Sequence, residues 1–200
     1  MRLDRPASLV APDLLGCLLR VDDVRVRITE VEAYEGEADP ASHAWRGVTP
    51  RTRVMFGPAG VLYVYFSYGM HSAVNVVCGE DGTASAVLLR AGEVVGGLDT
   101  VRLRRGPTAP GAGLARGPGN LGAALGLTWL DSGLALDGVR AELVAGEPVP
   151  HVSTGPRVGV SRAADVPWRF WITGDPTVSA YKRSPRAERP DPEVGRARLS

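Results

Sequence analysis

Residues 24–34, Val-Arg-Val-Arg-Ile-Thr-Glu-Val-Glu-Ala-Tyr, decide the fold. Their first half alternates Val or Ile with Arg or Thr, and this two-residue period is typical of a strand with one buried face. The strand is expected to continue to Glu32. Because side chains two residues apart in a strand point to the same face, Glu32 and Tyr34 are expected to line one cavity.

Three further strands follow at short intervals toward the C-terminus. They are expected at 61–66, 72–78 and 85–90, and tight turns separate them. Consecutive strands joined by tight turns form an antiparallel meander. The other expected elements are helices at 9–15, 97–105 and 120–125 and strands at 17–21, 157–160 and 169–173.

The segments outside these elements differ in character. The polar segment 35–50 is expected as a long loop, and loops of that length often carry function. Residues 106–119 are rich in Gly, Pro and Ala and predict a mobile surface loop, in which 106–115 is assigned no role. The chain end is Pro-rich and charged, so we expect one domain at 1–184 and a disordered tail at 185–200.

Composition favours a single globular domain. The 200 residues are 44% hydrophobic with both signs of charge mixed. Cys17 and Cys78 belong to no C-x-x-C pair, so neither a disulfide framework nor a zinc site is expected. Residues 1–20 are interrupted by Asp and Pro and lack the apolar core of a signal peptide, and no stretch approaches membrane-spanning length. We therefore expect a cytoplasmic protein with no membrane partner.

The formal net charge of +1 conceals an uneven distribution of charge. Residues 21–40 hold seven acids and two arginines, whereas 41–60 hold three arginines and 101–120 hold four, both without an acid. This pattern fits an acidic pocket flanked by basic stretches that meet phosphates, or charges on solvated loops. Of the 23 basic residues only Lys182 is a lysine, which excludes a Schiff base through a core lysine.

The candidate functional residues also have structural interpretations. A tyrosine in a strand is often a core residue with its hydroxyl at the edge, and a single His43 in a loop is often solvent-exposed or hydrogen-bonded. Glu32 could form a structural ion pair with Arg27 or Arg90. These alternatives stay open on the residues alone.

A set of ordered blocks resembles the alkyladenine (3-methyladenine) DNA glycosylase family. The resemblance spans about residues 8–180, and it is specific because the blocks recur in order with compatible spacing. The blocks are EVEAY at 30–34, DPASH at 39–43, TPR at 49–51, MF at 55–56, LYVY at 62–65, YGM at 68–70, Asn75, VLLRA at 87–91, GPG at 117–119, PRVGV at 156–160, WRF at 168–170 and VS at 178–179.

The resemblance implies a single α+β domain with a strongly curved antiparallel β-sheet and peripheral helices, which agrees with the meander. It implies a base-excision-repair enzyme that flips alkylated or deaminated purines (3-methyladenine, 7-methylguanine, hypoxanthine) out of double-stranded DNA and hydrolyses the N-glycosidic bond. Neither a cofactor nor a metal is expected. Without a core lysine, the product is an abasic site without strand cleavage, and nothing calls for more than a monomer.

The resemblance also implies roles for single residues. Glu32 matches the glutamate that activates the attacking water, and Arg90 lies beside that water, where its charge favours an ionised carboxylate. Tyr34, Tyr65 and His43 match the side chains that sandwich the extruded base. A cationic alkylpurine would gain cation–π attraction to a tyrosine face, which biases the pocket toward damage.

Further matched residues concern specificity and DNA binding. Asn75 matches a residue that disfavours guanine by crowding its exocyclic amino group. Tyr68 matches the ring inserted into the gap left by the flipped nucleotide, and Met70 is expected to share this intercalating role. Arg51 is expected to contact the DNA backbone. The chain departs from the pattern at Asn120, where the family often has a lysine, and this loss would weaken a backbone contact.

Two functions of other classes fit the same residues. One is a non-catalytic module that recognises distorted DNA, against which intact Glu32 and Arg90 speak. The other is a hydrolase of free nucleosides, which would need the pocket but neither a protruding Tyr68 nor basic surroundings.

Overall fold

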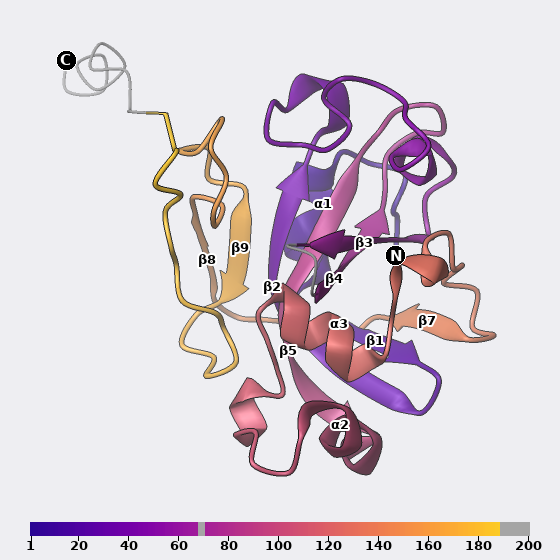
Figure 1. Ribbon diagram of the computed structural model, residues 1–200, viewed down its shortest axis with the longest axis vertical. Coiled ribbons are helices and arrows are strands. Elements are labelled where there is room, and N and C mark those ends of the chain that lie inside the picture. The colour runs from indigo at the N-terminus through magenta and orange to yellow at the C-terminus, as the bar shows by residue number, and fades with distance from the viewer. Residues whose placement is uncertain (68–70, 189–200) are drawn as a thin grey trace.

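The computed structural model describes residues 1–67 and 71–188. Its strands form an antiparallel sheet in the order β3-β4-β5-β2-β1-β7, with β6 paired to β5 and β9 paired to both β2 and β8 (Figure 1). The strands are β1 (Leu18–Val21), β2 (Val24–Tyr34), β3 (Leu62–Ser67), β4 (His71–Val77), β5 (Ala86–Gly96), β6 (Ala115–Arg116), β7 (Ala141–Val144), β8 (Val152–Gly155) and β9 (Arg169–Ile172). The helices are α1 (Ala7–Leu14), α2 (Leu98–Arg105) and α3 (Pro118–Leu125), and the 3-10 turns are η1 (Gly36–Ala38), η2 (Arg53–Phe56), η3 (Gly111–Gly113) and η4 (Trp129–Asp131).

The central strand β2 curls the sheet into a half-barrel because it changes partners along its length. β5 runs along one edge of β2, while the other edge pairs with β1 over 24–27 and then with β9 over 30–32. Register shifts between Ile28 and Val31 interrupt the pairing with β5 at the same point, and such bulges bend a strand and increase its twist. The predicted α+β domain with a strongly curved antiparallel sheet and peripheral helices is confirmed.

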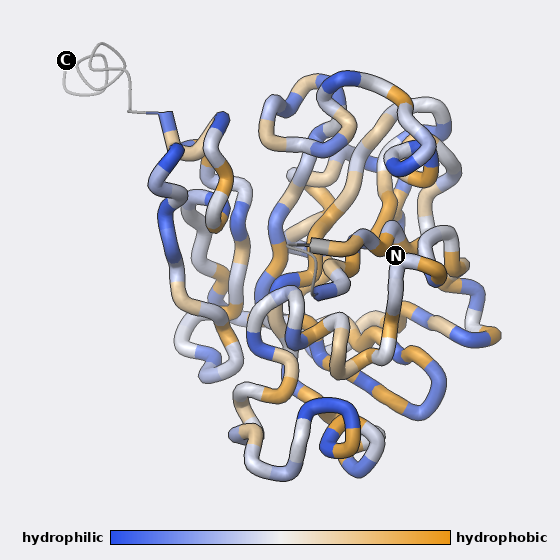
Figure 2. The backbone as a smooth tube through the Cα atoms, in the orientation of Figure 1, coloured by the Kyte–Doolittle hydropathy of each residue, from blue (hydrophilic) through white to orange (hydrophobic). Residues whose placement is uncertain are grey.

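The two faces of the sheet carry different residues. Val31 and Ala33 of β2, with Leu89 of β5 and Val74 of β4, face a core that α1 and α3 complete. Figure 2 shows apolar residues along the central strands and α3, and polar residues in the loops and in α2. The half-buried pattern predicted for β2 holds over its first residues, but 28–33 are buried on both faces. The second face therefore offers a sheltered polar surface.

The loop that follows β2 is anchored at its first residue. The carboxylate of Glu35 accepts hydrogen bonds from the backbone amides of Ala7 at 3.2 Å and Ser8 at 2.7 Å, at the start of α1. The first amides of a helix lack partners inside the helix, so a carboxylate there satisfies them and matches the helix dipole. Ser85 donates its hydroxyl to the same carboxylate at 3.2 Å. The long loop thus starts from a fixed position between α1 and β5.

The predicted strand at 157–160 is wrong, and the strand lies earlier, at β8. The backbone amide of Val158 donates to Glu32 Oε1 at 2.7 Å, so it is not available to a sheet ladder. The bends at Val158 and Gly159 follow from this different use of the backbone.

The segment 106–119 is not one irregular loop. It contains η3, the short strand β6 paired with β5, and the first residues of α3, which starts two residues before the predicted helix at 120–125. Strand β7 has no expected counterpart, because four residues give too short an alternation to detect. Of the predicted tail, 185–188 are described and 189–200 lie outside the described residues.

Close packing of α3 on β4 leads to a test of the fold. A Cβ atom at Gly122 would lie 2.2 Å from the carbonyl oxygen of Ser72, so Gly122→Ala should force α3 away from the sheet. We expect the free energy of unfolding to fall by about 1–3 kcal/mol despite the better helix propensity of alanine. Urea denaturation followed by circular dichroism measures the change.

Gly111→Ala is the matched control, because no atom lies within 4 Å of its added Cβ. Its stability should stay within about 0.5 kcal/mol of the parent protein. Equal stability of the two variants would contradict the close approach of α3 to β4.

Candidate active site

A cavity of about 510 Å³ opens on the polar face of the sheet. Its floor comes from β2, β3, β4 and β5, and its rim comes from the loop after β2 and the loop after β8. Small-molecule sites span roughly 300–1,000 Å³, so the space suits a ligand of the size of a nucleobase and its sugar. The floor residues are Glu32, Tyr34, Tyr63, Tyr65, Ala73, Asn75, Leu88 and Arg90.

Strand register explains why these side chains meet. Glu32 is paired with Leu88, Leu88 with Asn75, and Asn75 with Tyr63, so one row crosses four strands. Directly paired residues of an antiparallel sheet have side chains on the same face. Residues two positions along each strand, such as Tyr34, belong to that face too. The period-two pattern of the strands and their register together build the floor.

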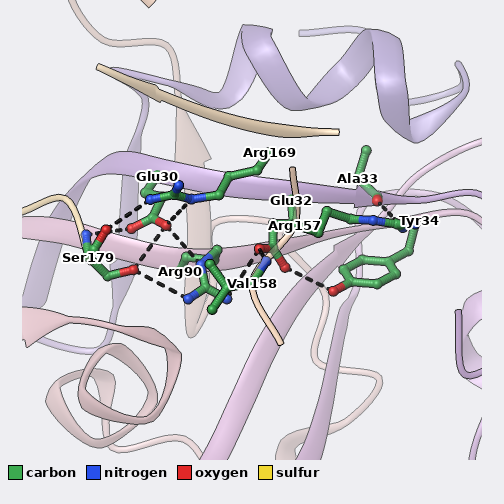
Figure 3. Close-up of polar contacts among 9 residues, drawn as sticks. All are labelled: Glu30, Glu32, Ala33, Tyr34, Arg90, Arg157, Val158, Arg169 and Ser179. Carbon is green, nitrogen blue, oxygen red and sulfur yellow. Dashed lines mark hydrogen bonds and ion pairs between the residues drawn. The ribbon is translucent and has the colours of Figure 1, made fainter. Parts of the chain in front are cut away.

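Glu32 lies on this floor with no solvent-exposed surface. Its carboxylate accepts hydrogen bonds from the Tyr34 hydroxyl at 2.8 Å and from the Val158 amide at 2.7 Å, and Arg90 Nη1 lies 3.3 Å from Oε1 (Figure 3). Burial and the charge of Glu32 raise the pKa of Tyr34 well above its usual value, so the phenol keeps the proton that it donates. A carboxylate has about four acceptor positions, so three donors leave one for a water molecule.

A second buried carboxylate, Glu30, lies two residues before Glu32. It accepts hydrogen bonds from Arg90 Nε at 2.8 Å, Arg169 Nε at 2.7 Å, and the Ser179 amide and hydroxyl at 2.7 and 2.9 Å (Figure 3). Burial alone would raise the pKa of Glu30, but Arg90, Ser179 and Arg169 outweigh it and lower the pKa. Arg90 therefore pairs with both carboxylates, while Arg27, the other suggested partner of Glu32, pairs with Glu93 and Asp175.

Aromatic rings form the walls of the cavity. The rings of His43 and Tyr65 pack edge to face with centroids 4.5 Å apart, and the rings of Tyr63 and Tyr65 lie 5.5 Å apart. His43 Nδ1 lies 3.2 Å from the Tyr63 hydroxyl, which fixes the imidazole at the rim. Asn75 donates its amide to the Tyr63 carbonyl at 3.0 Å, so its orientation is set by the backbone of β3.

His43 is neutral near pH 7. The side chain is exposed at the rim, but its contacts with Tyr63 and Tyr65 remove part of the imidazole from water, and the Arg51 guanidinium repels a second positive charge. Together these effects lower the pKa of His43 to about 4. A neutral imidazole can stack on a base and can either donate or accept a hydrogen bond.

A fully buried ion pair ties the two rim loops to the floor. Arg157 Nη2 donates to Asp39 Oδ1 at 2.9 Å, and Arg157 Nη1 donates to the other oxygen of Asp39 and to the carbonyl of Ala33, the latter at 3.0 Å. The guanidinium also lies 4.7 Å from the centroid of the Tyr34 ring. Asp39 and His43 lie in the loop after β2, and Arg157 and Val158 lie in the loop after β8. One ion pair therefore positions both loops of the rim.

The cavity brings together the predicted site residues that the structure describes, namely Glu32, Arg90, Tyr34, His43, Tyr65, Asn75 and Arg51. Tyr68 and Met70 lie outside the described residues. Arg51, predicted to contact DNA backbone, is exposed at the rim with its guanidinium 5.1 Å from the centroid of the Tyr65 ring.

Sequence reasoning assigned no role to four residues that build the cavity. The alternation over residues 61–65 does place Tyr63 on the same face as Tyr65, and both line the cavity. Asp39, Arg157 and Val158 all fall in blocks of the family resemblance, but nothing in the sequence pairs them with each other or with Glu32.

Among residues 1–67 and 71–188, no group of three His, Cys, Asp or Glu could hold a metal ion, and no helix is long and apolar enough to cross a membrane.

The sequence of the chain places it in a known class, the DNA glycosylases. The family model described as methylpurine-DNA glycosylase (MPG) matches residues 1–176. The chain belongs to this family, which confirms the resemblance seen in its sequence.

The names of proteins with similar sequences agree with this family. A protein of Nocardia farcinica named "Putative 3-methyladenine DNA glycosylase" is 60% identical over 92% of this chain and 91% of its own length. Proteins of the same name from Rhodococcus jostii and Cutibacterium acnes are 57% and 55% identical, over 91% and 88% of this chain and 84% and 96% of their own lengths. The chain therefore spans nearly the full length of these relatives.

The buried pair of Asp39 and Arg157 leads to a stability prediction. Asp39→Asn keeps the size of the side chain but leaves the Arg157 guanidinium buried without a counter-charge. We expect the free energy of unfolding to fall by about 3–5 kcal/mol, measured by urea denaturation.

The double variant Asp39→Leu with Arg157→Met removes both charges and should be more stable than Asp39→Asn, because no buried charge is left unpaired. A single Asp39→Asn variant as stable as the parent would show that the pair is not buried in solution.

The lowered pKa of His43 gives a pH prediction. Folding favours the neutral imidazole, so its contribution to stability is present above pH 6.5 and is lost as the pH falls from 6.5 toward 4, where the unfolded chain binds the proton. NMR titration should give an apparent pKa near 4 for the resonance that disappears in His43→Gln. A value at or above 6.5 would contradict the packing at the rim.

Proposed function

We propose that this protein removes alkylated or deaminated purines, such as 3-methyladenine, 7-methylguanine and hypoxanthine, from double-stranded DNA by flipping the base into the cavity and hydrolysing its N-glycosidic bond. The observation that carries the proposal is Glu32, a fully buried carboxylate with three donors and one open acceptor position beneath an aromatic wall. The family to which the chain belongs supports the same activity.

In the proposed reaction Glu32 orients a water toward the anomeric carbon and accepts its proton. Arg90 and the Val158 amide both contact Oε1, and together they fix the orientation of the carboxylate toward the water. The negative charge of Glu32 also stabilises the positive charge that develops on the sugar.

The flipped base would stack between Tyr34 and the pair formed by His43 and Tyr65. Such stacking contributes about 1–3 kcal/mol per base and offsets part of the cost of unstacking. Asn75, held by the Tyr63 carbonyl, would crowd the exocyclic amino group of guanine and so protect undamaged guanine.

The proposal extends to the partner and the product. Tyr68 and Met70 would fill the gap in the duplex, and Arg51 would meet the DNA backbone at the rim. No lysine occurs among the cavity-lining residues that the structure describes, which favours an abasic product without strand cleavage. We further propose that the protein works in the cytoplasm as a monomer and without a metal ion.

Two rival functions predict different products. A non-catalytic module would bind damaged duplex and release no base, and a nucleoside hydrolase would prefer free nucleosides to duplex DNA. The donor set around Glu32 leaves one acceptor position open, and this favours catalysis over binding alone, because a buried acid with an open acceptor position is costly to keep in a mere scaffold.

Glu32→Gln tests the proposed role of the carboxylate. The variant keeps the shape of the side chain but cannot take a proton from water, so we expect single-turnover release of hypoxanthine from duplex DNA to fall by at least about 100-fold. Binding of the damaged duplex should persist. Free base and abasic sites are quantified in buffer containing EDTA.

Glu37→Gln, an exposed glutamate of the same region that does not line the cavity, is the matched control and should release base at the parental rate. Near-parental release by Glu32→Gln would remove this carboxylate from the mechanism. Loss of parental activity in EDTA would refute the metal-free reaction.

A further inference from the structure

Arg51 carries a positive charge at the cavity that no carboxylate of residues 1–67 or 71–188 neutralises in an ion pair. Its guanidinium lies over the Tyr65 ring, with Cζ 5.1 Å from the centroid, and it lines the cavity. None of the ion pairs in the described part of the chain includes Arg51, whereas Arg90 pairs with Glu30 and Glu32. Arg90, the other arginine that lines the cavity, is therefore paired with carboxylates, whereas Arg51 is not paired within the described residues.

The other charges around the cavity cancel. Glu30 and Glu32 are matched by Arg90 and Arg169. The same balance holds behind the Tyr34 ring, where Asp39 faces Arg157. With His43 neutral near pH 7, the balance among these described groups is positive by the single charge of Arg51.

The charge of Arg51 reaches three walls of the cavity. It contributes to the low pKa of His43, after the larger effect of burial. Burial raises the pKa values of Tyr63 and Tyr65, and Arg51 opposes that rise at both phenols. A base held against His43 and Tyr65 would lie in the same field.

We propose that Arg51 is a specificity-determining residue that favours neutral purine lesions over cationic ones, by stabilising negative charge on the departing base. This inference rests on the proposed function, and it names the substrate class of that same cavity. A positive group near a leaving group lowers the barrier when the group departs with negative charge and not when it departs neutral.

The chemistry of the two lesion classes differs at the leaving group. In both, the bond between C1′ and N9 breaks with its electron pair on the purine, a water oxygen bonds to C1′, and Glu32 accepts a proton from that water. Hypoxanthine then leaves as an anion that takes a proton from solvent, whereas 7-methylguanine starts as a cation and leaves neutral. Only hypoxanthine develops negative charge for Arg51 to stabilise.

The experiment measures single-turnover base release from duplexes with hypoxanthine or 7-methylguanine under saturating protein, so that DNA affinity cancels. In Arg51→Gln the ratio of the hypoxanthine rate constant to the 7-methylguanine rate constant should fall by about tenfold relative to the parent protein. Arg53→Gln is the matched control. It removes an equal charge from an exposed position two residues away that does not line the cavity, and its ratio should stay parental.

An equal loss on both lesions in Arg51→Gln would overturn the proposal and assign Arg51 to a phosphate contact alone. A fall of the ratio in Arg53→Gln as large as in Arg51→Gln would overturn it as well, because the effect would then belong to general surface charge. A parent protein that releases neither base would refute the proposed function itself, which is a different result from an unchanged ratio.

A readout without DNA tests the electrostatic basis. Arg51→Gln should raise the pKa of His43 in an NMR titration, because the repelling charge is gone, while Arg53→Gln should leave it near 4. A His43 pKa unchanged in Arg51→Gln would show that the charge of Arg51 does not reach the cavity, and this outcome would overturn the proposal whatever the kinetics.

Discussion

Two buried carboxylates on one face of β2 require hydrogen-bond donors, and the rest of the structure supplies them. Glu30 and Glu32 have no exposed surface, and an ionised carboxylate without donors costs several kcal/mol to bury. Glu30 receives four donors and Glu32 receives three. Glu32 lines the cavity and Glu30 does not, so only Glu32 can meet a ligand or water held there. The position of each acid relative to the cavity therefore distinguishes the two carboxylates.

The donors come from distant parts of the chain, so the site forms only when the whole domain does. Arg169 belongs to β9, which pairs with β2, whereas Ser179 lies in the segment after β9 and Val158 in the loop after β8. β9 takes over this edge of β2 where β1 ends, at the same point as the register shifts in the pairing of β2 with β5. The pairing of β9 with β2 therefore accompanies the bend of the sheet and also brings Arg169 to Glu30.

Sequence patterns predict the strands but not the loops that complete the site. The alternation in β2 and β3 locates floor residues, but β2 pairs with β5 and not with β3, and this pairing, which puts Glu32 and Asn75 in one row, does not follow from a meander in chain order. The strand predicted at 157–160 fails because the amide of Val158 serves a side chain, a use that leaves no periodic signal. Asp39 and Arg157 are 118 positions apart, so only folding brings them together. The positions of Tyr68 and Met70 lie outside the described residues.

The charges around the aromatic rings alter which bases the aromatic wall is expected to bind. On sequence alone, the tyrosines promise cation–π attraction to a cationic purine. In the structure, guanidinium groups already lie over two of these rings. Arg157, 4.7 Å from the Tyr34 centroid, is paired with Asp39, whereas Arg51, 5.1 Å from the Tyr65 centroid, takes part in none of the ion pairs of the described residues. A second cation on the same ring gains less, because the first has polarised the ring and repels it directly. Stacking of a neutral base carries no such penalty, so the wall rewards flat, neutral ligands more than charged ones.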